Sequence, residues 1–515
     1  MQRLSALRTD AETARRRLAE VDEEIAQRFP AYSELAEGAP LSAPEAVSLL
    51  APDEVLVSIT PFGENGLFFT YGAEGGHYAQ LAGAAEAVTL AARLRCSAAG
   101  RLDPACAGVG APATAAAGGV AAADEIRGAE ALQRRTSAGG EVFDLDLAHD
   151  LYDRLFPEDV RTFLHGKKLI VAPAPELMGL PWHLLVTEAP PAGWRDSGAG
   201  RMRAYREAKW LFQSHPSITV LPTLASLRAL RSAAPERAAA DRAFLGVGDP
   251  VIGRNAAERD AAPMDCGMRP PVLVADAGAA PARSAGAMPT ALFVGERDGA
   301  GFALADAELV RSQPRLADTR CELAAVAGSL GGAGGADLLL GTDATEARLR
   351  ALDAGGALAR YRVLHFATHG LLGGELGLGE PGLVLTPPQK ASAQDDGILT
   401  ASEIATLTLA ADWVVLSACN TAAGSEADAE ALSGLARSFF YAGARSLLVS
   451  SWPVYSPAAV DLTTRAFTAM NGKPDIGRAE ALAIAMRETL AEASTEQTAH
   501  PSYWGPFFLV GEGER

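Results

Sequence analysis

A histidine and a cysteine that could act together, His369 and Cys419, each come shortly after an apolar run that ends abruptly. The runs are residues 361–366, Tyr-Arg-Val-Leu-His-Phe, and residues 413–416, Trp-Val-Val-Leu. Such runs predict buried strands of a parallel sheet, and in open α/β sheets the chemistry gathers beyond the carboxyl ends of the strands. We therefore expect both residues at one edge of a sheet. An imidazole beside a thiol can take its proton, which predicts a cysteine nucleophile with its base.

Two other interpretations of these residues stay open. Free cysteines are commonly buried, so Cys419 could be an inert core thiol and His369 a polar residue at a strand end. His365, His369 and Cys419 could also bind zinc. In a strand, however, residues 365 and 369 lie ~13 Å apart, and the glutamate of an HExxH motif is missing. We expect neither a metal nor a cofactor.

Three stretches carry further motifs: residues 365–370, His-Phe-Ala-Thr-His-Gly; residues 416–421, Leu-Ser-Ala-Cys-Asn-Thr; and residues 500–507, His-Pro-Ser-Tyr-Trp-Gly-Pro-Phe. Together they resemble the CHAT family of caspase-like and separase-like cysteine peptidases, and the likeness extends from about Leu49 to Val510. Cys419 follows His369 by 50 residues (419 − 369), close to the separation of about fifty residues in caspases. The resemblance implies a caspase-like, doubly wound α/β fold with a mostly parallel sheet, preceded by a non-catalytic caspase-like subdomain. The alternation of strand and helix patterns also predicts a parallel sheet.

The same resemblance implies a cysteine endopeptidase. Cys419 would attack a peptide carbonyl of a partner protein to form an acyl-enzyme, His369 would act as acid and base, and the backbone N–H groups of Gly370 and Cys419 would form the oxyanion hole. No third catalytic residue is evident, since Asp412 lies at the wrong end of its strand. The family serves in bacterial defence, for example by cutting gasdermin-like proteins, so a defence protein as substrate and an activator or sensor protein are the expected partners. The alternative is a catalytically inactive CHAT scaffold that binds partner proteins.

The segment after the predicted strand at 445–451 departs from the family pattern. Members carry Trp-x-Val followed by acidic residues there, whereas residues 451–456 of this chain read Ser-Trp-Pro-Val-Tyr-Ser. Carboxylates that could bind an arginine or lysine before the scissile bond are therefore missing. We expect a substrate-binding region formed by Ser450, Ser451, Trp452 and Tyr455, with an apolar primary pocket around the two aromatic rings.

The chain divides into three predicted parts, which are a charged N-terminal helix and linker at 1–40, a pseudo-caspase-like subdomain at 41–240 and the catalytic subdomain at 241–515. The first subdomain contains an Ala/Gly-rich insert without periodicity at 97–123. The catalytic subdomain contains a long loop at 253–317, and long loops in compact domains tend to be functional or disordered.

Local patterns place several elements within these parts. Residues 54–59 and 66–70 predict a hairpin, and residues 168–173 a buried strand. His183 has no cysteine partner in the sequence, so we expect a core or loop histidine. Residues 244–250 predict a strand that ends in a tight glycine turn, because the remaining residues of a phosphate-binding motif are absent.

Composition limits the partners. The 515 residues carry 45 basic and 63 acidic side chains, a formal net charge of −18, and nucleic-acid binding needs a basic face. No run approaches ~18 apolar residues and the charged N-terminus lacks a signal-peptide core, so we expect no membrane partner and a cytoplasmic location. The five cysteines are odd in number and without a CxxC pair, which favours unpaired thiols in a reducing compartment.

Overall fold

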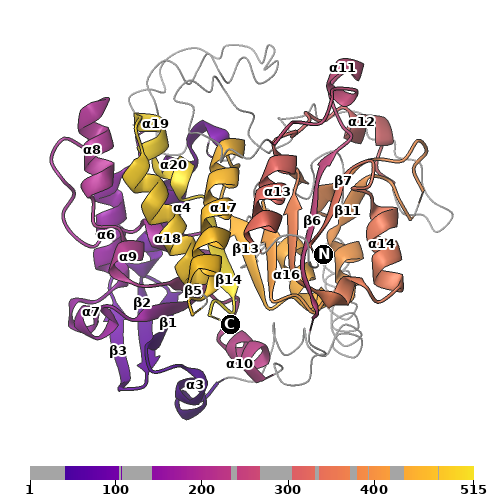
Figure 1. The fold of residues 1–515 in the computed structure, drawn as a ribbon. Helices are drawn as coiled ribbons and strands as arrows, with labels where there is room; N and C mark the ends of the chain where they lie inside the picture. The colour runs from indigo at the N-terminus through magenta and orange to yellow at the C-terminus, as the bar shows by residue number, and fades with distance from the viewer. Residues whose placement is uncertain are drawn as a thin grey trace, which may run out of the picture.

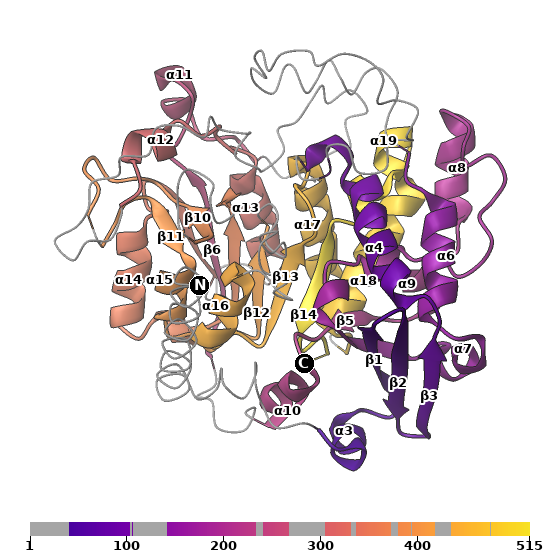
Figure 2. The same ribbon diagram turned by 180° about the vertical axis from the view of Figure 1, so that it is seen from behind.

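The structure is a computed structural model. It describes residues 41–103, 106, 142–232, 240–266, 304–330, 336–371, 380–392, 394–417, 434–473 and 475–514. An eleven-stranded sheet runs through this part of the chain with helices on both faces (Figures 1 and 2). Its strand order is β3-β2-β1-β4-β5-β14-β13-β12-β8-β6-β7, and a smaller sheet has the order β11-β10-β9.

The strands of the large sheet are β1 (Glu54–Phe62), β2 (Asn65–Gly72), β3 (Gly75–Leu81), β4 (Lys168–Pro173), β5 (Ile218–Val220), β6 (Arg242–Pro250), β7 (Ala336–Gly341), β8 (Tyr361–Ala367), β12 (Trp413–Leu416), β13 (Ser446–Ser450) and β14 (Phe507–Gly511). Those of the small sheet are β9 (Gly370–Leu371), β10 (Gly382–Val384) and β11 (Ile398–Thr400).

The α-helices are α3 (Ala43–Leu49), α4 (Ala84–Ala99), α6 (Leu145–Leu155), α7 (Glu158–Leu164), α8 (Ala199–Glu207), α9 (Leu211–Ser214), α10 (Leu224–Ser232), α11 (Ala256–Arg259), α12 (Ala307–Arg311), α13 (Thr319–Ser329), α14 (Glu346–Ala354), α15 (Ala401–Ala405), α16 (Gly434–Ala442), α17 (Ser456–Gly472), α18 (Arg478–Glu492), α19 (Glu496–Ala499) and α20 (Pro501–Trp504). Short 3-10 helices are η1 (Gly100–Leu102), η4 (Pro175–Leu177), η5 (Trp182–Leu184) and η7 (Leu358–Arg360).

Apart from the antiparallel edge strands β2 and β3, the large sheet consists of two parallel halves that run in opposite directions. In one half β1, β4, β5 and β14 are parallel neighbours, and in the other β13, β12, β8, β6 and β7 are. The halves join where β13 pairs antiparallel with β14. The carboxyl ends of the two sets of strands therefore face opposite edges of the sheet. The predicted α/β class with a mostly parallel sheet is confirmed.

The predicted hairpin is confirmed as β1 and β2, and β2 pairs further with an unpredicted edge strand, β3. Strands of both predicted subdomains share one sheet, and the division at residue 240 stays a prediction. The predicted N-terminal helix at 1–40 lies outside the described residues. So does most of the Ala/Gly-rich insert, although its first residues end α4. The described ends of the long loop at 253–317 contain two short helices, α11 and α12.

The core is rich in completely enclosed aromatic rings, among them Trp182, Trp210, Trp413, Trp452 and Trp504. His183 lies within it, as expected of a core histidine, and its Nε2 atom is 2.8 Å from the carbonyl oxygen of Gly505. This contact joins η5 to the motif at residues 500–507. A buried polar group needs a hydrogen-bond partner, so the contact accounts for a histidine in an otherwise apolar segment without a catalytic role.

Four of the five cysteines form disulfides, Cys96–Cys106 and Cys266–Cys321. The expectation of unpaired thiols was therefore wrong for these four, because the fold brings together cysteines whose sequence spacing gives no sign of pairing. Cys419 is the fifth cysteine and has no cysteine left to pair with. In the described residues no helix is long and apolar enough to cross a membrane.

Candidate active site

His369 lies two residues beyond the end of β8 and is held by the small sheet. Its carbonyl oxygen accepts a hydrogen bond from the N–H of Val384 at 3.0 Å, and the hydroxyl of Thr368 donates to the carbonyl of Val384 at 2.6 Å. The next residue, Gly370, begins β9 and pairs with Leu383. The backbone that carries the imidazole is thus fixed on both sides of His369.

The imidazole of His369 is completely buried, and its Nε2 atom is 2.7 Å from the carbonyl oxygen of Pro314. A carbonyl can only accept a hydrogen bond, so Nε2 carries the proton and Nδ1 carries the lone pair of the neutral ring. A ring in this tautomer can take a proton at Nδ1. Sequence reasoning missed Pro314, because a backbone acceptor leaves no residue-type signal.

The strand that leads to Cys419 lies beside the strand that leads to His369. β12 and β8 are parallel, with Val415 opposite His365, and the N–H of Ser417 donates to the carbonyl of Phe366 at 3.0 Å. The carboxyl ends of both strands therefore lie at the same edge of the sheet, as expected. Cys419 itself lies outside the described residues, so the dyad and the oxyanion hole of Gly370 and Cys419 stay predictions.

The predicted substrate-binding residues follow β13, the other neighbour of β12. Ser450 and Ser451 are buried, the indole of Trp452 is completely enclosed, and Tyr455 is half-buried before α17. The N–H of Ser451 donates to the carbonyl of Pro506 at 2.9 Å, and its carbonyl accepts from Arg95 Nε at 3.0 Å. A pocket around Trp452 and Tyr455 stays a prediction, and substrate contact with Trp452 would require the indole to leave the core.

His365, one of the three candidate zinc ligands, is completely buried. Its Nε2 atom is 3.0 Å from Oε1 of Glu322 on α13, outside hydrogen-bonding alignment. Thr463 on α17 donates to the same carboxylate oxygen at 3.2 Å. His365 and His369 thus face different partners, a carboxylate and a backbone carbonyl. This arrangement does not support a shared zinc ion.

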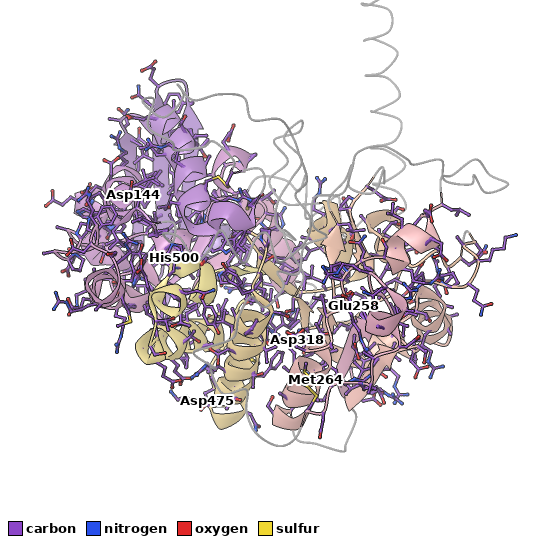
Figure 3. All side chains as sticks on the ribbon, turned by 90° about the horizontal axis from the view of Figure 1, so that it is seen from above. Asp144, Glu258, Met264, Asp318, Asp475 and His500 are labelled. Atoms are coloured by element: carbon purple, nitrogen blue, oxygen red, sulfur yellow. A yellow bond between two sulfur atoms is a disulfide. The ribbon has the colours of Figure 1, made fainter. Side chains whose placement is uncertain are left out.

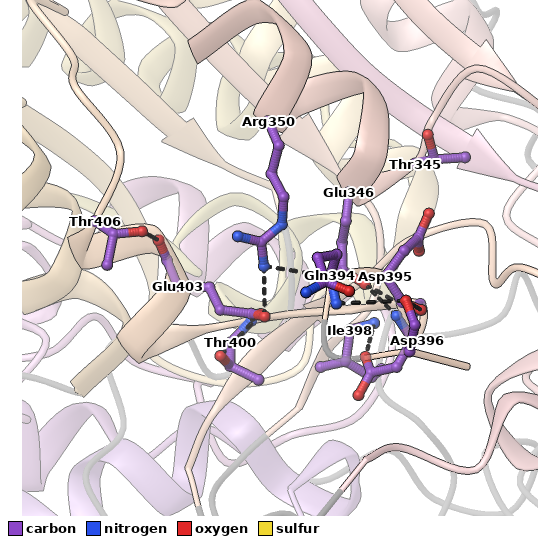
Figure 4. A network of polar contacts seen from close by, with 12 residues as sticks. Thr345, Glu346, Arg350, Gln394, Asp395, Asp396, Ile398, Thr400, Glu403 and Thr406 are labelled. Carbon is purple, nitrogen blue, oxygen red and sulfur yellow. Dashed lines mark hydrogen bonds and ion pairs between the residues drawn. The ribbon is translucent and has the colours of Figure 1, made fainter. Parts of the chain in front are cut away.

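A second polar cluster lies where α14 and α15 meet the turn before β11 (Figure 4). The Oε1 atom of Glu346 accepts the N–H groups of Asp396 at 2.9 Å and Gly397 at 2.8 Å. Arg350 Nη2 is 2.6 Å from Oε1 of Glu403 and 3.6 Å from Oε2 of Glu346. One arginine therefore faces two carboxyl groups, the buried Glu346 and the half-buried Glu403.

Burial, followed by the nearby carboxylates of Glu403 and Asp396, raises the pKa of Glu346 to about 9. Burial likewise raises the pKa of Asp396 and of Glu403. Glu346 therefore keeps its proton at neutral pH. Among the described residues, no three His, Cys, Asp or Glu side chains are placed to hold a metal ion.

Comparisons with known proteins agree with the motifs. Residues 145–512 match the family model of the CHAT domain. Tetratricopeptide repeat protein 28 of Mus musculus is 29% identical over 211 residues, and that of Homo sapiens is 29% identical over 214 residues. Each match covers 34% of this chain but only 8% of the relative.

Two solved structures are similar over most of the chain. The Saccharomyces cerevisiae separase–securin complex matches with a TM-score of 0.43 and 11% identity, over 95% of this chain and 31% of the other. The Arg-specific cysteine proteinase gingipain R (RgpB) matches with a TM-score of 0.36 and 8% identity, over 72% of this chain and 67% of the other.

Proposed function

Since this chain belongs to the CHAT domain family, we propose that it is a cysteine endopeptidase that cuts an extended segment of a partner protein. One observation carries the proposal. A histidine at the end of β8 is fixed with Nδ1 as its basic nitrogen, and the neighbouring parallel strand leads to the single cysteine that has no disulfide partner.

In the proposed reaction the thiol proton of Cys419 passes to Nδ1 of His369, and the thiolate attacks the scissile carbonyl carbon. The N–H groups of Gly370 and Cys419 would stabilise the oxyanion. The C–N bond breaks as the imidazolium gives its proton to the leaving amine. Water then attacks the thioester while His369 takes its proton, and the carboxylic acid and the free thiol are released.

For the substrate we propose a defence protein, such as a gasdermin-like one, with an apolar residue before the cut. The absence of acidic residues from 451–456 supports this preference. A peptide-library cleavage profile is expected to favour apolar side chains at that position, and a profile dominated by arginine or lysine would contradict it.

We propose a cytoplasmic location and a sensor or activator protein as a further partner. With its two disulfides the protein would be an exception among cytoplasmic proteins, whose thiols are usually kept reduced. Cell fractionation with a count of oxidised cysteines tests this location, because a periplasmic or secreted protein would contradict it.

Covalent labelling tests the enzyme directly. With the other four cysteines paired, iodoacetamide under non-reducing conditions should modify Cys419 alone, faster than it modifies a free cysteine. Cys419→Ala should abolish labelling, and His369→Ala should slow it. Labelling that is unaffected by His369→Ala would contradict the dyad.

An inactive scaffold is the second candidate. It is favoured by the complete burial of the His369 ring and by the internal hydrogen bonds of Ser451. Wild type and Cys419→Ala that bind the same partner equally, with no cleavage of that partner by either, would support the scaffold over the enzyme.

A further inference from the structure

Asp249 at the end of β6 has an unusual backbone and a completely buried side chain. Its φ of 47° is the only positive value among the described residues other than glycine, and 0% of its surface is exposed. The register of β6 against β7 shifts between Gly248 and Pro250, so Asp249 is the extra residue of a β-bulge. A left-handed backbone at a buried non-glycine residue is strained and persists only where its surroundings determine it.

Two arginines determine the position of this carboxylate. Arg315 donates from Nε to Oδ1 at 3.0 Å and from Nη2 to Oδ2 at 3.3 Å, and Arg320 donates from Nε to Oδ2 at 2.9 Å. The backbone N–H of Asp249 donates to Thr319 Oγ1 at 2.9 Å. The bulge therefore aims a buried carboxylate at the start of α13 and the residues before it.

Arg315 connects this carboxylate to His369. The carbonyl that accepts from His369 Nε2 belongs to the peptide unit between Pro314 and Arg315, so turning that carbonyl would move Arg315. Proline fixes φ of residue 314, so this unit can turn only about ψ of Pro314 and φ of Arg315. The guanidinium of Arg315 is fixed by Asp249 and by the carbonyl of Ala261, which accepts from Nη1 at 2.6 Å.

The bulge also lies directly beside the end of β8. Gly248 is opposite Ala367, two residues before the histidine. A Cβ atom at Gly248 would come within 2.7 Å of the Ala367 carbonyl oxygen, so glycine is what permits this close approach. Asp249 is thus the first residue of β6 beyond the contact with β8.

We propose that Asp249, acting through Arg315, is a positioning residue for His369. It holds the Pro314–Arg315 peptide so that its carbonyl keeps the ring proton on Nε2 and leaves Nδ1 as the base. This inference rests on the proposed role of His369 as the catalytic base. It gives the buried, bulged aspartate a function in a site whose sequence shows no third catalytic residue.

The disulfide Cys266–Cys321 links the two chain segments around Arg315 covalently. Cys321 follows Arg320 in α13, and Cys266 lies just beyond Ala261, whose carbonyl holds Arg315. Figure 3 shows Glu258 and Met264 of this segment on the same half of the molecule as Asp318, away from Asp144 and His500. The acceptors of Arg315 are therefore anchored to the helix that carries the second arginine.

The test compares the two arginines, because both bind Asp249 but only Arg315 adjoins the peptide that contacts His369. Arg315→Gln is expected to slow iodoacetamide labelling of Cys419 about tenfold. Arg320→Gln is expected to slow it less than threefold, because the bonds between Arg315 and Asp249 remain. Thermal unfolding of each variant shows whether it is folded at the labelling temperature.

A second readout follows the ring itself. The ¹⁵N chemical shifts of His369, assigned with His369→Gln, report which ring nitrogen carries the proton. Wild type is expected to show the Nε2–H tautomer, and Arg315→Gln a mixture of tautomers. Asparagine, like aspartate, tolerates the left-handed backbone region. Asp249→Asn should therefore also change the His369 ring from the Nε2–H tautomer to a mixture of tautomers.

Equal loss of labelling in Arg315→Gln and Arg320→Gln, together with unchanged ring shifts, would overturn the proposal. Wild-type labelling no faster than that of a free cysteine would instead count against the peptidase. In that case the ¹⁵N chemical shifts of the His369 ring in Arg315→Gln still decide whether Asp249 positions His369.

Discussion

His183 and His369 are buried histidines bound in the same way in different halves of the sheet. Nε2 of each lies within 3 Å of a backbone carbonyl, 2.8 Å for Gly505 and 2.7 Å for Pro314. His183, however, lies in a short helix after β4, whereas His369 continues from β8 beside the strand that leads to Cys419. A buried imidazole bound to a carbonyl is therefore not in itself a catalytic feature, and the neighbouring strand is what distinguishes the proposed catalytic histidine from His183.

The two halves also respond to pH in opposite directions. Burial lowers the pKa of His183, His215 and His500 to about 4. Between pH ~6.5 and 4 the unfolded chain takes up these protons and the folded chain does not, so these groups destabilise the fold as the pH falls. Glu346 in the other half, with its raised pKa, does so as the pH rises.

The largest expected effect distinguishes the two histidines. His369→Ala should slow labelling of Cys419 about thirtyfold at pH 7, because an ordinary thiol with a pKa of ~8.5 is only about 3% thiolate there. His183→Ala should leave labelling of the folded protein nearly unchanged but lower the free energy of unfolding by about 2–3 kcal/mol, because Gly505 loses its donor. Labelling rates and urea unfolding of both variants check this pair, and equal loss of labelling would remove the distinction.

The disulfides provide a second comparison between the halves. Cys266→Ala with Cys321→Ala should lower the free energy of unfolding by about 4 kcal/mol, and Cys96→Ala with Cys106→Ala by about 3 kcal/mol. The difference follows from the sequence separations of 55 and 10 residues, since closing the longer loop restricts the unfolded chain more. Chemical unfolding measures both values, and thiol titration of the unfolded wild type under non-reducing conditions should find one free thiol.

Glu346→Gln should stabilise the protein by about 1–3 kcal/mol at pH 7. In wild type the folded state keeps a proton that the unfolded chain releases above pH ~4.5, so stability decreases up to pH ~9. Glutamine keeps an oxygen that accepts the N–H groups of Asp396 and Gly397, and it has no proton that the unfolded chain would release. Urea unfolding at several pH values measures the difference, and a difference that does not grow from pH 5 to 8 would show that Glu346 is already ionised.

The smallest effects concern arginines. Arg95→Gln should cost about 1–2 kcal/mol, because its side chain links the buried Asp103 of the first half to the carbonyl of Ser451 in the second. Arg360→Gln, which breaks the exposed ion pair with Asp241, should leave the unfolding temperature almost unchanged. Thermal unfolding compares the two, and equal costs would mean that Arg95 does not stabilise the contact between the halves.

Apolar runs predicted much of the sheet. Such runs correspond to the hairpin β1–β2 and to the buried strands β4, β6, β8 and β12. Strand β3 was missed because Gly75, Gly76 and His77 are exposed and carry no apolar alternation. The position of His369 at a strand end was also predictable, because it depends on the run before it.

The surroundings of His369 were less predictable. Its acceptor is a backbone carbonyl, and Asp249 was interpreted as part of a glycine turn because a bulge depends on pairing with β7. Disulfide partners likewise depend on which segments meet in the fold, which sequence spacing did not reveal. The features missed are those set by tertiary contact rather than by local pattern.

The antiparallel pairing of β13 with β14 has a mechanical consequence. Two lobes joined by a linker can hinge apart, but these share a ladder that runs from Ser446 to Ser450 and pairs residue by residue with Phe507 to Gly511. Opening the molecule along this line would break that ladder and expose its backbone groups. This shared ladder therefore opposes hinge motion between the two halves and leaves loops and side chains as the parts that can move without breaking it.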